Sequence, residues 1–422
     1  MTAIFLAPVY LGLLLYLLLR LFHWLASFHR RLASRVFRGV LGAGFLLLAL
    51  TPLGGCLISA GPLHRLLRIV SNFWLGMLLY ILLIVGLADI LAFVIRKVYQ
   101  RRGRPFDRRK FCRRAGSLAA AAILLVSAGG LLHAYDIRVH RQALTVDKAC
   151  RLPGLRVALI ADLHLGYSVG AATMERMVEK INREQPDIVC LAGDIFDNEF
   201  EAIHEPQRVA AILRKIESRY GVYACWGNHD VKERVLAGFT FRDKKAKEED
   251  PRFLAFLEQA GITLLEDESL LIDDAFYLAG RKDYSKSRKM QEERLTPAAL
   301  TAGLDRGKPI LVMDHQPKEL AALAAAGVDV DLSGHTHGGQ VFPGNLLMPL
   351  VWENPVGIQV KDGMYSCVTS GVGVWGPAMR VDGQRNFDIG HPFRGMTKAA
   401  RAIWPRRLLS AVITPHPFYN RW

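Results

Sequence analysis

Residues 155–166 of this chain read LRVALIADLHLG, a short apolar run that ends in polar residues. The run from 157 to 161 is too short for a typical helix and has the length of a strand, and Asp162 and His164 follow it directly. A strand that leads into a polar loop is a typical unit of a layered α/β domain.

The same unit recurs along the chain. Four further apolar runs end in polar loops: DIVCLAGDIFD at 187–197, GVYACWGNHD at 221–230, PILVMDHQP at 309–317 and VDVDLSGHTHGGQ at 328–340. Amphipathic stretches lie between the first of these runs. Residues 171–184 predict a helix whose buried face carries Met174, Met177, Val178 and Ile181, and residues 209–220 predict a second helix. We therefore expect an α/β domain over residues 150–385.

The polar residues at the five strand ends are of one chemical kind. Each loop carries Asp, His or Asn, the residue types that ligate transition metals. In open α/β sheets the ligand site forms beyond the carboxyl ends of the strands. Five separate segments should therefore deliver metal ligands to one edge of the domain.

The blocks ADLHLG, AGDIFD, GNHD, MDHQP and SGHTHGGQ, in this order, resemble the calcineurin-like metallophosphoesterases. The match spans about residues 155–380, and the GHTHGGQ ending followed by Phe342 and Pro343 resembles a bacterial, membrane-associated branch. The resemblance implies an αββα sandwich and a hydrolase of phosphoester bonds that uses two divalent metal ions. Mn is the metal we expect, with Fe and Zn as alternatives.

The resemblance also implies a role for each matching residue. Asp162, His164 and His337 would hold the first metal, Asn228, His315 and His335 the second, and Asp194 would bridge both. A metal-activated hydroxide would be the nucleophile, with the two ions about 3.5–4 Å apart. Asn228 and His229 would contact the phosphate, and His229 would protonate the leaving oxygen. Asp197 and Asp230 could orient these groups.

Other charged residues fit a solvated surface better than a site. Arg281, Lys282 and Lys318 could grip a phosphate, but exposure to solvent is the better expectation for each. Residues 242–252, RDKKAKEEDPR, predict a solvated loop, with a substrate lid as the weaker alternative. Residues 386–422 form a basic tail with aromatic residues, which suits an anionic membrane surface. Disorder and packing against the domain are equally good alternatives for this tail. The six cysteines show no CxxC spacing, and Cys190 and Cys225 fit reduced core thiols.

The first 140 residues predict a membrane region. Four apolar stretches, at about 4–22, 40–60, 73–95 and 115–134, each approach the length of about 20 residues that crosses a bilayer as a helix. Mean hydropathy is +0.17 and 51% of the residues are hydrophobic, which is high for a purely soluble protein. We therefore expect a transmembrane helical bundle ahead of the α/β domain.

The charge distribution gives this region an orientation. Residues 1–150 hold 20 Lys and Arg against 4 Asp and Glu, whereas residues 151–380 hold 27 against 33. The basic excess of the chain thus belongs to the apolar region and the tail, which argues against a nucleic-acid surface. Arginines at 30–38 and the basic residues at 96–114 favour the cytoplasmic side. The N-terminus and everything after the fourth span would then lie outside the cytoplasm.

The sequence RRKFCR at 108–113, followed by an Ala-rich segment, resembles a twin-arginine translocation signal. The equally good alternative is that these arginines only orient a cytoplasmic loop. Three functions remain open. The first is an extracytoplasmic hydrolase of a phosphodiester or diphosphate, lipid-linked or part of the cell envelope. The second is a cytoplasm-facing hydrolase of a lipid-precursor diphosphate, and the third is a membrane scaffold that binds metal without catalysis.

Overall fold

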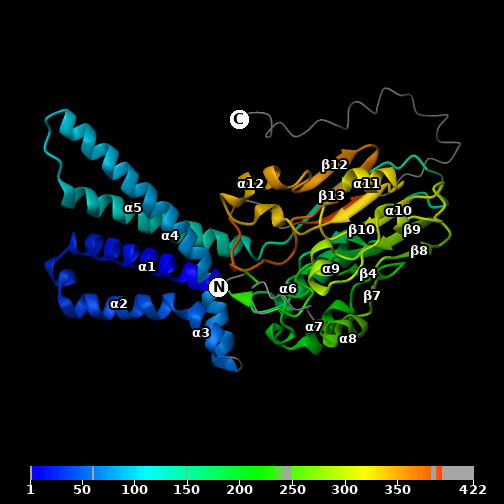
Figure 1. The fold of residues 1–422 in the computed structure, drawn as a ribbon, viewed down its shortest axis with the longest axis horizontal. Helices are drawn as coiled ribbons and strands as arrows, with labels where there is room; N and C mark the ends of the chain where they lie inside the picture. The colour runs from blue at the N-terminus through cyan, green and yellow to red at the C-terminus, as the bar shows by residue number, and fades with distance from the viewer. Residues whose placement is uncertain are drawn as a thin grey trace.

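The computed structural model describes residues 2–58, 61–148, 150–233, 235–236, 239–240, 249–381 and 386–391. Figure 1 shows an arm of long helices beside an α/β domain. The predicted charged loop at 242–252 falls mostly outside the described residues, and so does the tail from residue 392 onward. The cysteines whose side chains the structure describes are free, and Cys190, Cys225 and Cys367 are buried.

The helical arm is built from the first part of the chain. Its helices are α1 (Thr2–Ala26), α2 (Arg35–Ala49), α3 (Thr51–Leu57), α4 (Pro62–Arg101) and α5 (Arg108–His133), with a short turn η1 (Arg30–Ala33). Within the described residues, 4 helical segments are long and apolar enough to cross a membrane: Pro8–Ala26, Arg35–Gly55, Pro62–Arg101 and Arg108–His133. Length and composition thus agree with the four spans expected from the sequence.

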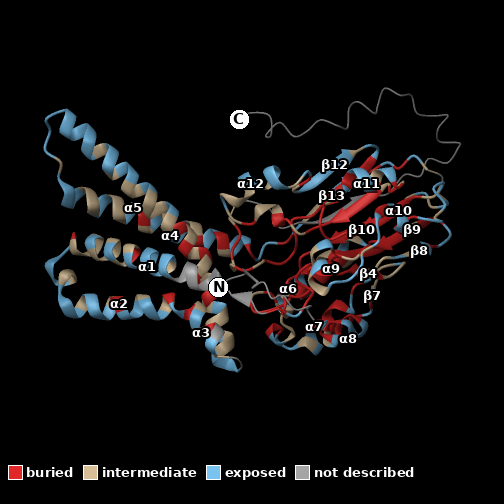
Figure 2. Ribbon diagram, viewed as in Figure 1, coloured by how far each residue is buried: buried red, intermediate tan, exposed pale blue. Residues whose placement is uncertain are grey.

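The arm packs through a narrow apolar seam and leaves most of its apolar surface outside. Leu14, Leu17, Ala49, Trp74 and Leu78 form its buried cluster. Most other apolar side chains of these helices are partly or fully exposed, as Figure 2 shows. A helix that is apolar on its outer face as well as its inner one suits a surrounding of lipid.

Two helices differ from the predicted spans. The second span is divided at residue 50 into α2 and α3, and Thr51 and Pro52 begin the new helix. The third helix begins at Pro62 rather than near residue 73 and runs for 40 residues. Its polar first turns are helical because they dock on the α/β domain: Asn72 Nδ2 donates to Ser168 Oγ at 3.0 Å.

The one carboxylate in the third predicted span, that of Asp89, has its partners on another helix of the arm. Tyr16 of α1 donates a hydrogen bond to Asp89 of α4 at 2.7 Å, and Arg20 of α1 forms an ion pair with the same carboxylate. A charge in an apolar surrounding is stabilised when a partner neutralises it. Asp89 therefore ties α4 to α1.

The α/β domain contains two sheets of six strands. The first has the order β1-β14-β2-β3-β4-β7, from β1 (Arg138–Ala143), β14 (Asn386–His391), β2 (Val157–Ile160), β3 (Ile188–Ala192), β4 (Val222–Cys225) and β7 (Ile262–Leu264). The second has the order β12-β13-β11-β10-β9-β8, from β12 (Gly357–Lys361), β13 (Met364–Val368), β11 (Val330–Ser333), β10 (Ile310–Met313), β9 (Phe276–Gly280) and β8 (Glu268–Ile272). A short pair, β5 (Val235–Leu236) and β6 (Phe239–Thr240), stands apart.

Four adjacent strands in each sheet are parallel. Strand β2 pairs with β3, β3 with β4, and β4 with β7 in this way, as do β9, β10, β11 and β13 in the second sheet. Strand β14 lies antiparallel to β2 and parallel to β1. The predicted boundary at residue 385 therefore falls just before a strand of the first sheet. Distant pairing of this kind leaves no mark in local sequence.

Alternating residues of the strands face different parts of the core. Val157 and Leu159 of β2 belong to a cluster that also contains Leu311 and Met313 of β10, so this cluster lies between the two sheets. Ala158 and Ile160 instead pack with the helices α6 (Ala171–Glu184), α7 (Pro206–Leu213) and α8 (Pro251–Ala260). This period of two is the property of a pleated strand with both faces buried.

The second sheet is covered on its outer side in the same manner. Ile310 and Val312 of β10 pack with residues of α10 (Pro297–Leu300) and α11 (Leu320–Ala325). The helix predicted at 171–184 is confirmed as α6, with Met174, Met177, Val178 and Ile181 buried. The helix predicted at 209–220 instead spans Pro206–Leu213, because Pro206 fixes its first turn and the chain then turns back toward β4.

Candidate metal centre

The candidate site lies where parallel strands of both sheets end. Asp162 and His164 follow β2, Asp194 follows β3, and Asn228 and His229 follow β4 in the first sheet. His315 follows β10, and His335 and His337 follow β11 in the second. The structure thus brings all seven predicted ligands to one edge of the domain, as the position of the strand ends requires.

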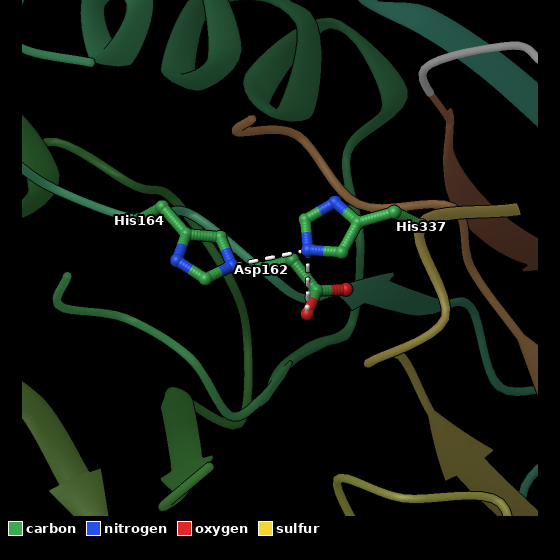
Figure 3. Close-up of side chains that lie close together, drawn as sticks. All are labelled: Asp162, His164 and His337. Atoms are coloured by element: carbon green, nitrogen blue, oxygen red, sulfur yellow. Dashed lines mark hydrogen bonds and ion pairs between the residues drawn. The ribbon is translucent and has the colours of Figure 1, made fainter. Parts of the chain in front are cut away.

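The first group joins Asp162, His164 and His337 (Figure 3). His164 Nε2 lies 3.0 Å from His337 Nε2, and His337 Nε2 lies 3.7 Å from Asp162 Oδ1. All three residues are buried. Two imidazole nitrogens that ligate one ion at about 2.1 Å each lie about 3 Å apart when their bond angle is near 90°. The separation of these rings fits a common cation.

The second group joins Asp194, His315 and His335. His315 Nε2 lies 3.1 Å from Asp194 Oδ2, 3.2 Å from His335 Nδ1 and 3.2 Å from Asn228 Oδ1. Asp194 Oδ2 is also 3.7 Å from His164 Nε2 of the first group. One carboxylate therefore stands between the two groups, and the amide oxygen of Asn228 completes the second.

The backbone at these residues is unusual. Asp162 (φ 54), His164 (φ 46), Asp194 (φ 52), His335 (φ 69) and His337 (φ 52) all have left-handed backbone angles. A residue with a side chain reaches this region only at an energetic cost, and such residues concentrate at functional sites. The sharp turns direct neighbouring side chains into one small volume at the strand ends.

Two glycines let the loops come close enough. A Cβ at Gly227 would lie 2.2 Å from Asp194 Oδ1, and a Cβ at Gly334 would lie 2.6 Å from Asp162 Oδ2. No larger residue fits at either place without displacing a carboxylate of the site. The Gly-Asn-His-Asp and Gly-His-x-His patterns thus have a packing reason as well as a chemical one.

The protonation of the site fits a cation. Burial, reinforced by the neighbouring His315, lowers the pKa of His335 well below its usual range; burial and His164 do the same for His337. Burial opposes ionisation of Asp194, but His315 and His229 nevertheless hold the pKa of its carboxyl well below its usual range. Burial opposes protonation of His315, but the neighbouring Asp194 nevertheless raises the pKa of its imidazole well above the usual range. A cation beside Asp194 would take the place of that proton, because a histidine that ligates a metal is neutral.

The carboxylate of Asp162 is fully buried, and the carboxylate of Asp194 lies near it. Burial raises the pKa of Asp162 to about 6, although the backbone N–H of His335 donates to both of its oxygens at 3.0 Å. An uncompensated carboxylate at this depth is unfavourable without a positive charge. The donor set and its electrostatics therefore suit divalent cations.

His229 lies beside the groups without joining the seven. Its backbone N–H donates to Asp194 Oδ1 at 2.7 Å, and its ring centre is 5.1 Å from that of His164. Its Nδ1 lies 2.5 Å from Asn198 Oδ1. Asn198 in turn donates from Nδ2 to the carbonyl of Val231 at 3.1 Å, so its amide oxygen faces the imidazole. Asn198 therefore orients His229.

The two aspartates expected to orient these groups have other contacts. Asp197 Oδ1 lies 3.6 Å from Nδ1 of His164, and an oxygen of Asp197 also lies within 4.8 Å of a ring nitrogen of His229. Asp230 accepts the backbone N–H groups of Phe196 at 2.8 Å and Gly227 at 2.7 Å, so it fixes the two loops that carry Asp194 and Asn228. Asp230 acts on the loops, whereas the amide of Asn198 takes the role expected of a carboxylate.

Arg380 is a second residue that sequence reasoning missed. It is fully buried and donates to the carbonyl oxygens of His337 at 3.1 Å and Ser370 at 3.0 Å. Its backbone N–H donates to the carbonyl of Gly130 in α5 at 2.9 Å. Arg380 thus connects the loop of a candidate ligand to the helical arm. No local pattern around residue 380 signals this role, because its partners lie far away in sequence.

The three basic residues weighed as phosphate-binding groups have different environments. Arg281 is 2% exposed and donates to Asp314 at 3.0 Å, so the expectation of a solvated side chain is wrong for it. Burial is stable there because the carboxylate of Asp314 neutralises the charge. Lys282 pairs with Glu292 at 3.2 Å near the surface. Lys318 lies over the ring of Trp352 at 5.1 Å, and that ring packs on His335 at 5.0 Å. Lys318 is therefore the one of the three that approaches the site.

Comparison with known proteins agrees with this geometry. The family model of the calcineurin-like phosphoesterases matches residues 155–339. A protein of Aquifex aeolicus named as a metallophosphoesterase is 27% identical over 260 residues, which cover 61% of this chain and 92% of that protein. A Helicobacter pylori metallophosphoesterase is 28% identical over 54% of this chain and 56% of its own length.

One relative that matches the same share of this chain is named as a transmembrane protein. The Danio rerio transmembrane protein with metallophosphoesterase domain is 29% identical over 245 residues, 54% of this chain and 51% of that protein. The chain thus spans about half the length of some of the curated relatives it matches. The matched region contains all seven candidate ligands. This chain therefore carries a calcineurin-like phosphoesterase domain, the catalytic domain of metal-dependent phosphoester hydrolases.

Proposed function

We propose that this chain is a membrane-anchored hydrolase that cleaves phosphoester bonds with two divalent cations. The seven candidate ligands that would hold these cations are called the cage: Asp162, His164, Asp194, Asn228, His315, His335 and His337. The observation that carries the proposal is the place of Asp194, whose Oδ2 lies 3.1 Å from His315 Nε2 and 3.7 Å from His164 Nε2. A single carboxylate between two ligand groups is the arrangement that a bridging ligand needs. The first ion would be held by Asp162, His164 and His337, the second by Asn228, His315 and His335, with Asp194 shared.

When bound, the two cations would supply an activated water and stabilise negative charge on the phosphoryl group, and Mn, Fe and Zn all suit these ligands. The protein would contribute the position of the substrate. The amide of Asn228 is a neutral ligand, so it limits the negative charge that faces an anionic phosphate. This donor set fits a phosphate ester better than a cationic substrate.

His229 is the proposed proton donor to the leaving oxygen. Burial lowers the pKa of its imidazole to about 4, so the ring is neutral in the free protein at pH 7. Asn198 Oδ1 accepts a hydrogen bond from Nδ1 of His229, which leaves Nε2 of the same ring to face a substrate. A phosphate anion beside Nε2 would raise the pKa of the ring and favour the protonated form that can donate.

The enzyme proposal is tested on the full chain in detergent with bis-p-nitrophenyl phosphate and added Mn²⁺. Asp194→Asn should abolish turnover, because it weakens the charge shared by both groups. Asp274→Asn is the matched control, since Asp274 is 61% exposed and pairs with Lys308 at the surface. Metal-dependent turnover that persists in Asp194→Asn, or is absent from the wild-type chain, contradicts the proposal. The second outcome would favour a scaffold that only binds metal.

The proposed architecture is a transmembrane bundle over residues 1–140 and an αββα sandwich over residues 150–385. The sandwich is supported by the apolar cluster between the two sheets and by the helices that pack on their outer faces. The bundle is supported by the four long apolar helices and their exposed apolar surface. Residues 386–391 would then extend the sandwich by one strand.

The catalytic domain is proposed to face away from the cytoplasm. The basic turns at 27–34 and 102–107 lie at the end of the helical arm that points away from the domain (Figure 1). The start of α4 instead contacts the domain: His64 Nε2 lies 2.8 Å from Tyr167 Oη, and Arg65 donates to the carbonyl of Ala202 at 2.9 Å. Positive turns stay on the cytoplasmic side, so the opposite end of the helices would be outside.

Reporter fusions distinguish this orientation from the cytoplasm-facing alternative. Alkaline phosphatase fused after the domain should be active, and the same reporter inserted at Gly103 should be inactive. The inverse pattern would favour a cytoplasmic hydrolase of a lipid-precursor diphosphate. Changing Arg108 and Arg109 to Lys tests the proposed twin-arginine route, because Lys keeps the charge that orients the loop. Retained export of the variant would contradict that route and leave the orientation standing.

The substrate class we favour is a phosphodiester or diphosphate linked to a lipid or to the cell envelope. The support is the connection between the site and the helical arm, which would hold the cage near head groups. Lipid and envelope profiles of a strain that lacks the protein should match those of a strain with Asp194→Asn. A phosphorylated species that accumulates in both, and not in wild type, would identify the substrate.

A further inference from the structure

The helix α12 (Gly344–Val351) is apolar and almost uncovered. It follows the candidate ligand His337 by a few residues and has the sequence GNLLMPLV, without a charged residue. None of its eight residues, all of them described, is buried. Leu346 is 61% exposed, Leu350 82% and Val351 69%. An exposed patch of this kind usually marks a surface that binds another apolar body.

The position of α12 indicates which body that is. Figure 1 shows α12 at the end of the domain that faces the helical arm, and Figure 2 shows its exposed surface there. The backbone N–H of Phe342, just ahead of α12, donates to the carbonyl of Val381 at 2.9 Å. Val381 also lies against Gly130 near the end of α5, since a Cβ built at Gly130 would be 2.7 Å from Val381 Cγ2. The start of α12 is therefore held at the level where α5 enters the domain.

The other end of α12 leads to the candidate metal centre. Trp352, the residue after the helix, packs on the ring of His335 at 5.0 Å, and Lys318 lies over the same Trp ring at 5.1 Å. Trp and Lys are residues that favour the boundary between apolar chains and head groups. The apolar helix, this boundary pair and the ligand cluster thus follow one another along a short path.

We propose that α12 inserts its apolar side chains into the bilayer that the helical arm crosses, so that the metal centre opens at the head groups of that membrane. The inference rests on the proposed membrane anchor and deepens it, because it names the surface that the domain contacts. The partner is the boundary between head groups and acyl chains of one leaflet. A helix with exposed Leu and Val residues and a Trp at its end binds this boundary by burying apolar area.

The test uses the full chain in vesicles of phosphatidylcholine and phosphatidylglycerol. An environment-sensitive fluorescent amino acid replaces Leu350, introduced at a stop codon so that no cysteine is changed. The control probe replaces Leu271, which is 44% exposed and lies on β8. Strand β8 is at the opposite edge of the second sheet from β12, so the two probes share one scaffold. Alkaline carbonate extraction verifies that each labelled chain is integrated in the membrane.

Two quenchers separate the outcomes. Acyl chains that carry bromine should remove most of the emission at position 350 and leave position 271 unchanged, whereas aqueous iodide should do the reverse. Emission at 350 that iodide quenches as strongly as at 271 would overturn the inference. Protection from iodide without bromolipid quenching would assign the surface to a protein partner and would also overturn it. A chain released by carbonate would instead refute the membrane anchor itself.

Discussion

The substitution Gly227→Ala tests how tightly the loops around Asp194 are packed. The added Cβ would lie 2.2 Å from Asp194 Oδ1 and 2.3 Å from Asp194 N. Because an ordinary carbon contact is about 3.4 Å, the loop or the carboxylate must move by about 1 Å. Asp194 is the proposed bridge between both cations, so either movement changes the cage.

The expected size follows from this displacement. A misplacement of about 1 Å at a catalytic group lowers the rate about 100-fold, so kcat/KM should fall by that factor. Overpacking a dense interior costs about 1–3 kcal/mol, which for a domain of this size lowers Tm by about 2–4 °C per kcal/mol. The protein should therefore fold, bind less metal and turn over slowly.

The assay is hydrolysis of bis-p-nitrophenyl phosphate with Mn²⁺ by the full chain in detergent, alongside metal content and Tm. Gly170→Ala is the matched control: its added Cβ would meet nothing within 4 Å, and Gly170 precedes α6 outside the cage. The control should keep wild-type kcat/KM. Wild-type turnover and metal content in Gly227→Ala would refute the close packing of Asp194 against the 227–230 loop.

Three other predictions address the same site and its support. His229→Ala should lower kcat by about 100- to 10,000-fold with metal content unchanged, because it removes a proton donor and no ligand; loss of bound metal would contradict this role. Chelation with EDTA should lower Tm, and restoring free metal to about 100 times its Kd should return about 2.7 kcal/mol of stability; an unchanged Tm would mean that no cation is bound. Asp331 on β11 is buried beside Asp314, and both its burial and that neighbour raise the pKa of its carboxyl well above the usual range. Since a raised folded pKa makes stability fall as pH rises, Asp331→Asn should gain Tm relative to wild type as the pH rises above about 4, the ordinary pKa of an Asp carboxyl. The amide oxygen of Asn at the Oδ2 position can still accept the hydrogen bonds of Ser333 and Ser366, so a constant Tm difference across pH would refute ionisable Asp331 as the cause.

The local parts of the structure could be predicted from the sequence. The run before Asp162 is apolar at every position, and the structure makes it the buried strand β2. The spacing of Met174, Met177, Val178 and Ile181 places them on one helix face, which is buried in α6. The spacing of apolar residues that distinguishes a strand from a helix involves only neighbouring positions, and so does the length of an apolar run that can cross a membrane.

The identity of the candidate ligands was also local information. Asp162, His164 and the residues like them each follow an apolar strand, and parallel strands place such residues at one edge. The sequence could not determine the separations between them. The loops of β2, β3 and β4 meet those of β10 and β11 only because an apolar cluster holds the two sheets face to face.

Tertiary structure alone decided the supporting residues and the surroundings of the cage. Asn198 faces His229 across 31 positions, and Arg380 reaches the carbonyl of His337 across 43. Contacts between such distant positions arise from loop closure and packing, so no periodic pattern records them. The sequence motifs indicated the metal ligands by themselves. The exposure of α12 depends instead on which elements pack around it, so only the tertiary structure shows that its apolar side chains are uncovered.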